Sequence, residues 1–99
     1  ALALVGAGYG NGYMRSLSSK GHVLIHGCRC PVAGRVCMDQ CVIDVTDCPH
    51  VDVDDEVVLF GRQDDCLLPV GDVAEWANSI SYELMCLAGR LNPRIYLEP

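Results

Sequence analysis

The sequence predicts a mainly β fold, a compact barrel-like or sandwich-like domain with one or two short helices near its C-terminus. Over the first two thirds of the chain, short apolar runs rich in valine and isoleucine alternate with turn residues. In the last third, apolar residues recur at spacings of three and four, which is the helical period. Because 99 residues suffice for a single hydrophobic core, we expect one domain over residues 1–99.

The expected strands are short segments with the composition of a sheet core. Residues 22–25, 42–45 and 57–60 are rich in β-branched or aromatic residues, and turn residues flank them. An acidic turn at residues 52–56 precedes the third strand. A final strand is expected at residues 94–97, after the helical region.

The predicted helical stripe consists of Val73, Trp76, Ala77, Ile80, Leu84 and Leu87. Asp72 is the expected N-cap, and Glu75 three residues later completes a capping-box pattern. Residues 78–81 contain weak helix formers, so we expect a break there and a second short helix starting at one of its two serines. Gly89 is the predicted C-terminal stop.

Charge and composition exclude several classes of function. Seven basic and thirteen acidic residues give a net charge of −6, which argues against nucleic acid or an anionic membrane as the main partner. No apolar run reaches the roughly 18 to 20 residues of a membrane span. The chain opens without Met and without a secretory signal, so we expect a domain of a longer protein. Its seven cysteines are expected to be reduced cytosolic thiols, mostly buried.

The glycine-rich stretch at residues 5–15 does not have the spacing of a dinucleotide-binding loop. The amphipathic helix that should follow such a loop is also missing, since residues 16–21 are typical of a turn. The glycines flank Tyr9 and Tyr13 at points where the backbone can bend sharply. The simplest interpretation is a turn on which these tyrosines pack.

The segment H-G-C-R-C raises the alternative of a zinc-binding module. In a strand, His26, Cys28 and Cys30 would share one face, and Cys37 could supply a fourth ligand. However, structural zinc sites usually pair cysteines as C-x-x-C, and this segment has C-x-C. We therefore predict no metal site and keep a zinc-binding or plain interaction module as the alternative function.

The segment G-R-V-C-M-D-Q, residues 34–40, has two interpretations. As a strand, it would present Arg35, Cys37 and Asp39 on one face and bury Val36 and Met38 on the other. Alternatively, it is a strand end at a ligand cleft, where a backbone N–H holds a carboxylate and Arg35 and Asp39 form a polar wall.

Tyr82 stands near the start of the second predicted helix. The N-terminus of a helix attracts anions such as phosphate, and a tyrosine hydroxyl adds one donor. The alternative is an amphipathic tyrosine in the core.

In order, the segments G-Y-G-N-G-Y, P-V-A-G-R-V-C-M-D-Q, V-V-L-F-G-R-Q, A-E-W-A-N-S-I-S-Y-E-L and P-R resemble the C-terminal domain of alanine racemase, from about Val5 to Tyr96. Serine racemases of the same family, some of them membrane-tethered, share these motifs. The resemblance implies a homodimeric isomerase that uses pyridoxal 5'-phosphate to interconvert L- and D-alanine, or serine, and supplies D-alanine for cell-wall peptidoglycan. It also implies that the β domain of one subunit closes the partner's active site.

By the same resemblance, individual residues acquire expected roles. The backbone N–H of Met38 contacts the substrate carboxylate, Tyr9 lines the inner entrance of the partner's site, and Tyr82 contacts the cofactor phosphate. The remaining matches are the entrance-channel residues Arg15, Arg35 and Ile80 and the polar-network residues Asp39 and Arg94.

The resemblance places no catalytic residue in this chain. The family's catalytic tyrosine lies in a V-S-Y-G-type segment upstream, and the cofactor lysine belongs to an N-terminal barrel domain that this chain lacks. The isolated domain is therefore expected to be inactive. Departures from the family pattern include Asn11 in place of the usual Asp, and Asp64 in place of the usual Gly. The sequence leaves open whether alanine or serine is the substrate, and whether the parent is a cytoplasmic protein or the cytoplasmic domain of a tethered one.

Overall fold

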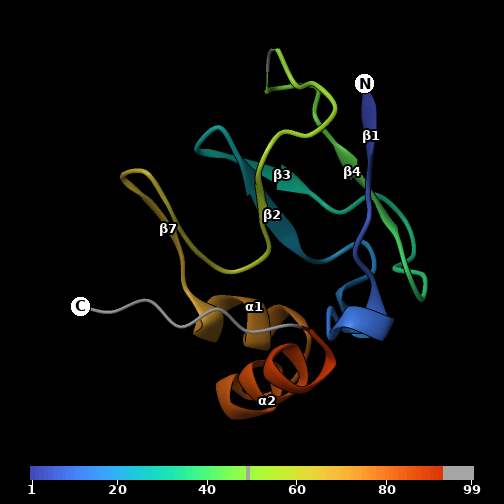
Figure 1. The fold of residues 1–99 in the computed structure, drawn as a ribbon, viewed down its shortest axis with the longest axis vertical. Helices are drawn as coiled ribbons and strands as arrows, with labels where there is room; N and C mark the ends of the chain where they lie inside the picture. Colours follow the sequence, from blue (N-terminus) through green and yellow to red (C-terminus); the bar gives the residue numbers. More distant parts are fainter. Residues whose placement is uncertain (49, 93–99) are drawn as a thin grey trace.

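The computed structural model describes residues 1–48 and 50–92, in which short antiparallel strands precede two helices (Figure 1). The strands are β1 (Leu2–Val5), β2 (His22–Ile25), β3 (Cys28–Pro31), β4 (Cys41–Asp44), β5 (Val57–Val58), β6 (Gly61–Gln63) and β7 (Cys66–Leu68). The helices are α1 (Val70–Trp76) and α2 (Ser81–Leu91), and two single 3₁₀ turns, η1 (Tyr9–Asn11) and η2 (Arg15–Leu17), follow β1. The prediction of a mainly β domain with two short helices near the C-terminus is confirmed.

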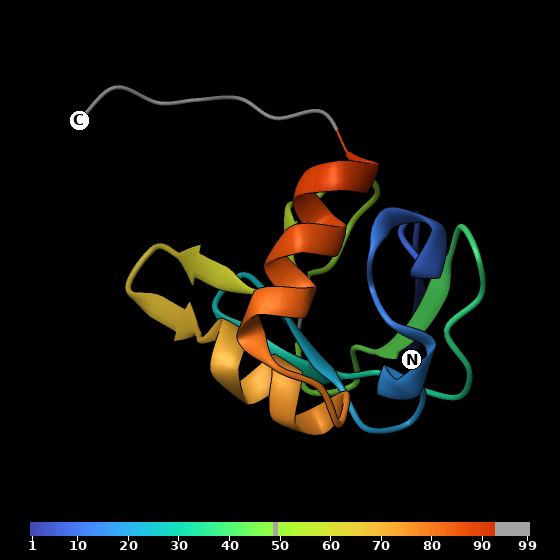
Figure 2. The ribbon, with the colours of Figure 1, turned by 90° about the horizontal axis from the view of Figure 1, so that it is seen from below.

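The strands pair as three small antiparallel sheets, ordered β1–β4, β3–β2–β5 and β6–β7. A single bridge between Val32 and Ile43 connects the end of β3 to β4. Within the described residues, these sheets do not close into a continuous barrel. Figure 2 shows α1 and α2 side by side, with the blue glycine-rich turn next to α2.

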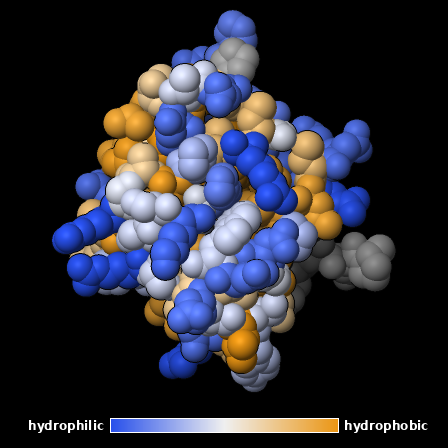
Figure 3. All heavy atoms as spheres, turned by 180° about the vertical axis from the view of Figure 1, so that it is seen from behind, coloured by the Kyte–Doolittle hydropathy of each residue, from blue (hydrophilic) through white to orange (hydrophobic). Residues whose placement is uncertain are grey.

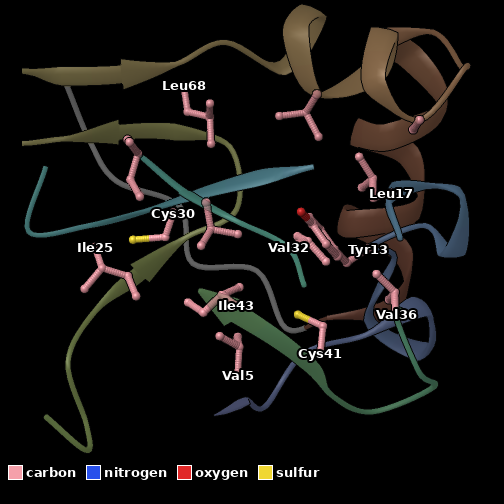
Figure 4. Packing of buried hydrophobic residues seen from close by; sticks show 14 of the residues in the cluster. Val5, Tyr13, Leu17, Ile25, Cys30, Val32, Val36, Cys41, Ile43 and Leu68 are labelled. Atoms are coloured by element: carbon pink, nitrogen blue, oxygen red, sulfur yellow. The ribbon is translucent and has the colours of Figure 1, made fainter. Parts of the chain in front are cut away.

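The core joins the sheets to both helices. Three successive residues of β2, residues 23–25, are almost inaccessible, so both faces of this strand are covered. Leu17 from η2, Leu68 from β7 and Leu84 from α2 are buried in the same cluster. Figure 4 shows the Tyr13 ring beside Val32, among aliphatic side chains. The packing of this one cluster therefore sets how the glycine-rich turn lies against the sheets and helices.

The cysteines behave in part as the composition predicts. Cys30, Cys41 and Cys48 are buried in the core, whereas Cys37 is exposed and the other three are half-buried. Burial raises the pKa of the Cys48 thiol to about 12, and a hydrogen bond with Cys28 adds to the rise. A thiol with so high a pKa is a poor nucleophile, so Cys48 acts as a small hydrophobic residue.

Strand boundaries differ from the sequence predictions by a few residues. The strand expected at 42–45 begins one residue earlier, and the one expected at 57–60 ends at Val58, where the chain turns toward β6. The sequence patterns did not reveal β1, β3, β6 or β7. The strand predicted at 94–97 lies outside the described residues.

The predicted N-cap of the first helix was wrong. Helix α1 begins at Val70, and Pro69 is its N-cap with φ −63° and ψ 138°. Asp72 therefore lies in the first turn of α1, where its negative charge interacts favourably with the positive end of the helix dipole. The Asp72 side chain lies 3.9 Å from the Arg29 guanidinium. Proline starts the helix earlier because its missing N–H is not needed there and its ring fixes φ.

The predicted break between the helices is confirmed. Asn78 has a φ of 55°, and α2 begins at Ser81. Ile80, which the stripe predicted to be buried, is instead an extended N-cap residue that is 65% exposed. The predicted stop at Gly89 was wrong, because α2 continues to Leu91 and Asn92 is its C-cap.

The face opposite to that of Figure 1 mixes polar and apolar side chains, with polar residues across its middle (Figure 3). Neither helix in the described part of the chain has the length and apolar character needed to cross a membrane.

Candidate functional site

Residues 34–40 form the loop between β3 and β4 and contain no strand. The predicted alternation fails because Val36 is buried at 1% exposure whereas Met38 is 59% exposed. The loop turns on itself through a 2.9 Å hydrogen bond from the N–H of Cys37 to the carbonyl oxygen of Gln40. The interpretation of this segment as a strand was therefore wrong, and its Met38 side chain faces solvent. The segment instead leads directly into β4, which begins at Cys41.

The glycine-rich turn holds this loop in place. The N–H of Tyr9 donates to the carbonyl oxygen of Cys37 at 2.9 Å, and the N–H of Gly10 donates to that of Met38 at 2.7 Å. A side chain at Gly8 would place its Cβ 2.0 Å from the Cys37 oxygen, and one at Gly10 would lie 2.9 Å from the Met38 oxygen. Glycine is needed at both positions because two backbones touch here.

An open depression of about 270 Å³ lies where the turn and the loop meet. Its lining includes four residues that the sequence singled out, Tyr9, Arg15, Arg35 and Met38, with Val36 and Cys37 between them. Within the described residues, the Met38 N–H donates no hydrogen bond, although the carbonyl oxygen of the same residue is bonded. The structure therefore brings Arg15, Arg35 and Tyr9 to one depression with Met38, whose N–H is unengaged within the described residues.

This set of groups suits a small anion. Guanidinium groups bind carboxylates through two parallel hydrogen bonds, and hydrogen bonds from a backbone N–H to a charged acceptor are among the stronger ones. Arg15 and Arg35 are exposed, so their attraction for an anion is partly screened until something covers the depression.

Two other predicted site residues lie on a different element. Ile80 and Tyr82 are at the N-terminal end of α2 and do not line the depression. The Tyr82 side chain is 71% exposed, so the alternative of a core tyrosine is wrong. Beside it, Ser79 donates a 2.8 Å hydrogen bond to Glu83. The first turn of α2 thus carries an exposed tyrosine, in the part of a helix whose N–H groups have no partner within the helix.

The remaining predicted polar residues are less informative. Asp39 is exposed on the loop beside Met38, outside the lining of the depression. Arg94 lies outside the described residues.

The zinc alternative fails on geometry. His26 and Gly27 form the turn between β2 and β3, so His26 does not share a strand face with Cys28 and Cys30. The exposed His26 ring instead lies 2.9 Å from a carboxylate oxygen of Asp55. In residues 1–48 and 50–92, no group of three His, Cys, Asp or Glu side chains is arranged to hold a metal ion.

Sequence reasoning missed two polar contacts that organise this region. Asn11, in the glycine-rich turn, and Asn92, at the end of α2, are hydrogen-bonded to each other. Gln63, the one buried polar residue of the described core, accepts from the N–H of Gly27 at 2.9 Å and donates to the carbonyl oxygen of Glu56 at 3.1 Å. Neither contact has a local signature, because each joins residues that are distant in the sequence or in different turns.

Comparison with known proteins supplies the family. The family model described as "Alanine racemase, C-terminal domain" matches residues 1–96. The chain belongs to this family. Alanine racemase 1 of Clostridium acetobutylicum is 46% identical to the domain over 97 residues, and the alanine racemase of Desulforamulus reducens is 49% identical over 96. These matches cover 98% and 97% of the chain, and 25% of each relative.

Solved structures agree with this assignment. The alanine racemase of Streptomyces coelicolor superposes with a TM-score of 0.88 at 39% identity, covering 99% of this domain and 25% of that chain. The enzyme from Bartonella henselae, solved with covalently bound pyridoxal phosphate, superposes with a TM-score of 0.84 at 32% identity, covering 97% of this domain and 27% of that chain. The racemase domain thus spans about a quarter of the length of the relatives it matches.

Proposed function

We propose that this domain is the C-terminal part of a pyridoxal-phosphate-dependent racemase that interconverts L- and D-alanine, or serine. The observation that carries the proposal is the family match over residues 1–96. It is supported by the depression in which Tyr9, Arg15, Arg35 and Met38 converge. The domain would supply binding groups, while the general bases would come from sequence outside it.

The substrate carboxylate would be held at the loop of residues 34–40. The Met38 N–H is the donor. The peptide unit that carries it is fixed by the bond from the Tyr9 N–H to the Cys37 oxygen, while the N–H itself is unengaged within the described residues. Arg15 and Arg35 would attract the carboxylate and line the entrance channel, and Tyr9 would narrow it. A donor on a fixed backbone orients a small substrate without a loss of side-chain entropy.

The cofactor phosphate would lie at the start of α2. The Tyr82 hydroxyl and the N–H groups of the first turn of α2 would both donate to the phosphate, because a helix N-terminus favours an anion. When bound, pyridoxal phosphate acts as an electron sink for the carbon that loses its proton. The role of the domain is to fix the phosphate end, so that the reactive ring is correctly placed.

The partners would be an N-terminal barrel domain and a second subunit. One face of α2 carries the exposed residues Tyr82 and Met85, which line an open depression together with Cys86 and Gly89. Exposed apolar side chains on one helix face are typical of a surface that another protein covers. We infer that the domain faces the active site of a partner subunit in a cytoplasmic homodimer.

The test uses the purified full-length protein that carries this domain, assayed by the loss of optical rotation of L-alanine and, separately, of L-serine. Met38→Pro removes the N–H, whereas Met38→Leu keeps it and changes only an exposed side chain. We expect racemisation by the wild type, a KM for Met38→Pro raised about tenfold or more, and a KM for Met38→Leu within about twofold of the wild type. Melting curves of both variants control for folding.

Two results would contradict the proposal. Absence of racemisation of either amino acid by the cofactor-loaded wild type would refute the activity. Equal KM values for the two Met38 variants would refute the assigned role of the backbone donor.

A further inference from the structure

The glycine-rich turn is packed between two parts of the domain that the proposed function uses. On one side, Gly8 and Gly10 contact the loop at Cys37 and Met38. On the other side, Gly12, with a φ of 93°, lies against α2. A Cβ at Gly12 would be 3.0 Å from the Ala88 nitrogen. Figure 2 shows this turn lying along α2. The turn therefore physically links the proposed carboxylate site to the helix that begins with the proposed phosphate site.

A reciprocal pair of amides closes the link on the α2 side. The Nδ2 of Asn92 donates to the backbone carbonyl oxygen of Asn11 at 2.6 Å and to that of Ala88 at 3.0 Å. The Nδ2 of Asn11 donates to the Oδ1 of Asn92 at 3.1 Å, and the Oδ1 of Asn11 accepts from the N–H of Gly8 at 3.3 Å. Both side chains are partly buried.

These hydrogen bonds determine how the oxygen and the nitrogen of each side-chain amide are oriented. Because the Nδ2 of Asn92 lies against two carbonyl oxygens, its Oδ1 must be the atom turned toward Asn11. Asn11 must therefore present a donor to Asn92 while its own oxygen accepts from Gly8. An ionised aspartate satisfies the Gly8 contact but has no donor for Asn92.

We propose that Asn11 and Asn92 are a positioning pair that fixes Tyr9 and the Met38 loop relative to α2. The inference rests on the proposed function, since it assigns the pair to alignment of the two binding sites. Asn92 also caps α2 through Ala88, so one side chain ends the helix and ties it to the turn. Neither amide titrates, so the link holds over the whole working pH range.

Asn11→Asp tests the donor with almost no change of shape. Above the pKa of the new carboxyl group, its oxygens face the Oδ1 of Asn92, and two acceptors repel each other. We expect kcat/KM for alanine in the full-length enzyme to fall about tenfold at pH 8, mainly through KM. As the pH falls and the new carboxyl takes up a proton, it regains a donor, so the ratio of variant to wild-type kcat/KM rises. A merely structural defect would leave that ratio independent of pH.

A second pair of variants isolates the contact. Asn92→Ala removes the opposing acceptor, so the double variant Asn11→Asp/Asn92→Ala is expected to have the same kcat/KM as Asn92→Ala alone. Lys20→Gln, at an exposed position in the turn after η2, makes the same change in charge; it is the matched control and should have wild-type kinetics. If the losses in kcat/KM of the two single variants add up in the double variant, the two residues act independently and the proposed pair is refuted.

Hydrogen exchange provides a readout that does not depend on activity. The amides of Tyr9 and Gly10, which are bonded to Cys37 and Met38, should exchange faster in Asn11→Asp and not in Lys20→Gln. If the wild type racemises alanine but Asn11→Asp matches it in KM, pH profile and exchange, the positioning pair is refuted and the proposed function stands. If the wild type is inactive but the exchange change occurs, the link stands and the proposed function fails.

Discussion

The N–H of Gly10 donates a 2.7 Å hydrogen bond to the carbonyl oxygen of Met38. Together with the bond from Tyr9 to Cys37, it joins two loops that are distant in the sequence, although neither belongs to a strand. The peptide unit between Cys37 and Met38 is thereby held by its oxygen, and the peptide that follows is held by Gly10, while the Met38 N–H stays available within the described structure. A backbone group held in this way is a preorganised donor for a carboxylate.

Replacement of Gly8 by alanine should damage the site. The new Cβ would lie 2.0 Å from the Cys37 oxygen and 2.8 Å from the Met38 carbonyl carbon, so the two backbones must separate. We expect a loss of about 1–3 kcal/mol in the free energy of unfolding and a raised KM. Gly6→Ala is the matched control, because no atom lies within 4 Å of its added Cβ. Thermal melts and kinetics of the full-length protein would reveal whether the two variants differ, and equal behaviour would contradict the close contact.

Removal of the Gln63 amide should destabilise the domain. In Gln63→Leu, the N–H of Gly27 and the carbonyl oxygen of Glu56 both lose a partner. We expect a cost of about 1–3 kcal/mol, the usual penalty for leaving such groups unsatisfied. Urea denaturation measures the change, with Arg62→Gln as an exposed control on the same strand. A midpoint unchanged in Gln63→Leu would show that the amide is dispensable.

Loss of the Tyr82 hydroxyl should weaken cofactor binding. Because Tyr82 is exposed here, Tyr82→Phe is expected to keep the melting temperature of the cofactor-free protein unchanged. The dissociation constant of pyridoxal phosphate should rise about tenfold, as expected when one hydrogen bond to a charged group is removed. Titration followed by absorbance measures this constant. An affinity equal to that of the wild type would count against a phosphate contact.

Acidification should destabilise the domain through His22. Burial lowers the pKa of the His22 imidazole, and the nearby Arg29 lowers it further. Its Nδ1 is buried without a partner in the described structure, and its ring lies 5.0 Å from that of Trp76. The folded state therefore favours the neutral ring, so stability is full above the unfolded pKa of about 6.5. The free energy of unfolding declines as the pH falls below that value, because the unfolded chain then takes up a proton at His22 that the folded chain does not.

The measurement is the melting temperature of the full-length protein from pH 7.5 to 5. His22→Phe should reduce the loss of stability over this range, because no proton is taken up on unfolding at that position. His50→Gln, at an exposed position, should retain the wild-type slope. A slope that is the same in His22→Phe and the wild type would exclude His22 as its source.

Local patterns predicted the elements whose cause is local. The apolar run of β2 and the break at residues 78–81 follow from side-chain preferences within a few residues, and both are confirmed. The end of α2 is different. Gly89 is a local stop signal, but the helix continues because Asn92 caps Ala88 and is in turn held by Asn11. A contact from the other end of the chain overrides the local preference.

The loop at residues 34–40 illustrates the same limit. Its alternation of polar and apolar residues is typical of a strand, yet its conformation is determined by hydrogen bonds from Tyr9 and Gly10. The glycine spacing of the turn was visible in the sequence, but the contacts that require glycine could not be predicted from it. Gly8, Gly10 and Gly12 are needed where another backbone approaches, and that approach exists only in the folded chain.

The sequence by itself determined the mainly β class, the family, and which residues are candidates for the site, because these depend on residue types and their order along the chain. Only the tertiary structure decided that Tyr9, Arg15, Arg35 and Met38 share one depression while Tyr82 stands apart on α2. It also decided that Asn11 meets Asn92 and that the Met38 N–H has no acceptor among the described residues. These relationships arise from contacts between segments distant in the chain, whose geometry is set by the packing of one shared core.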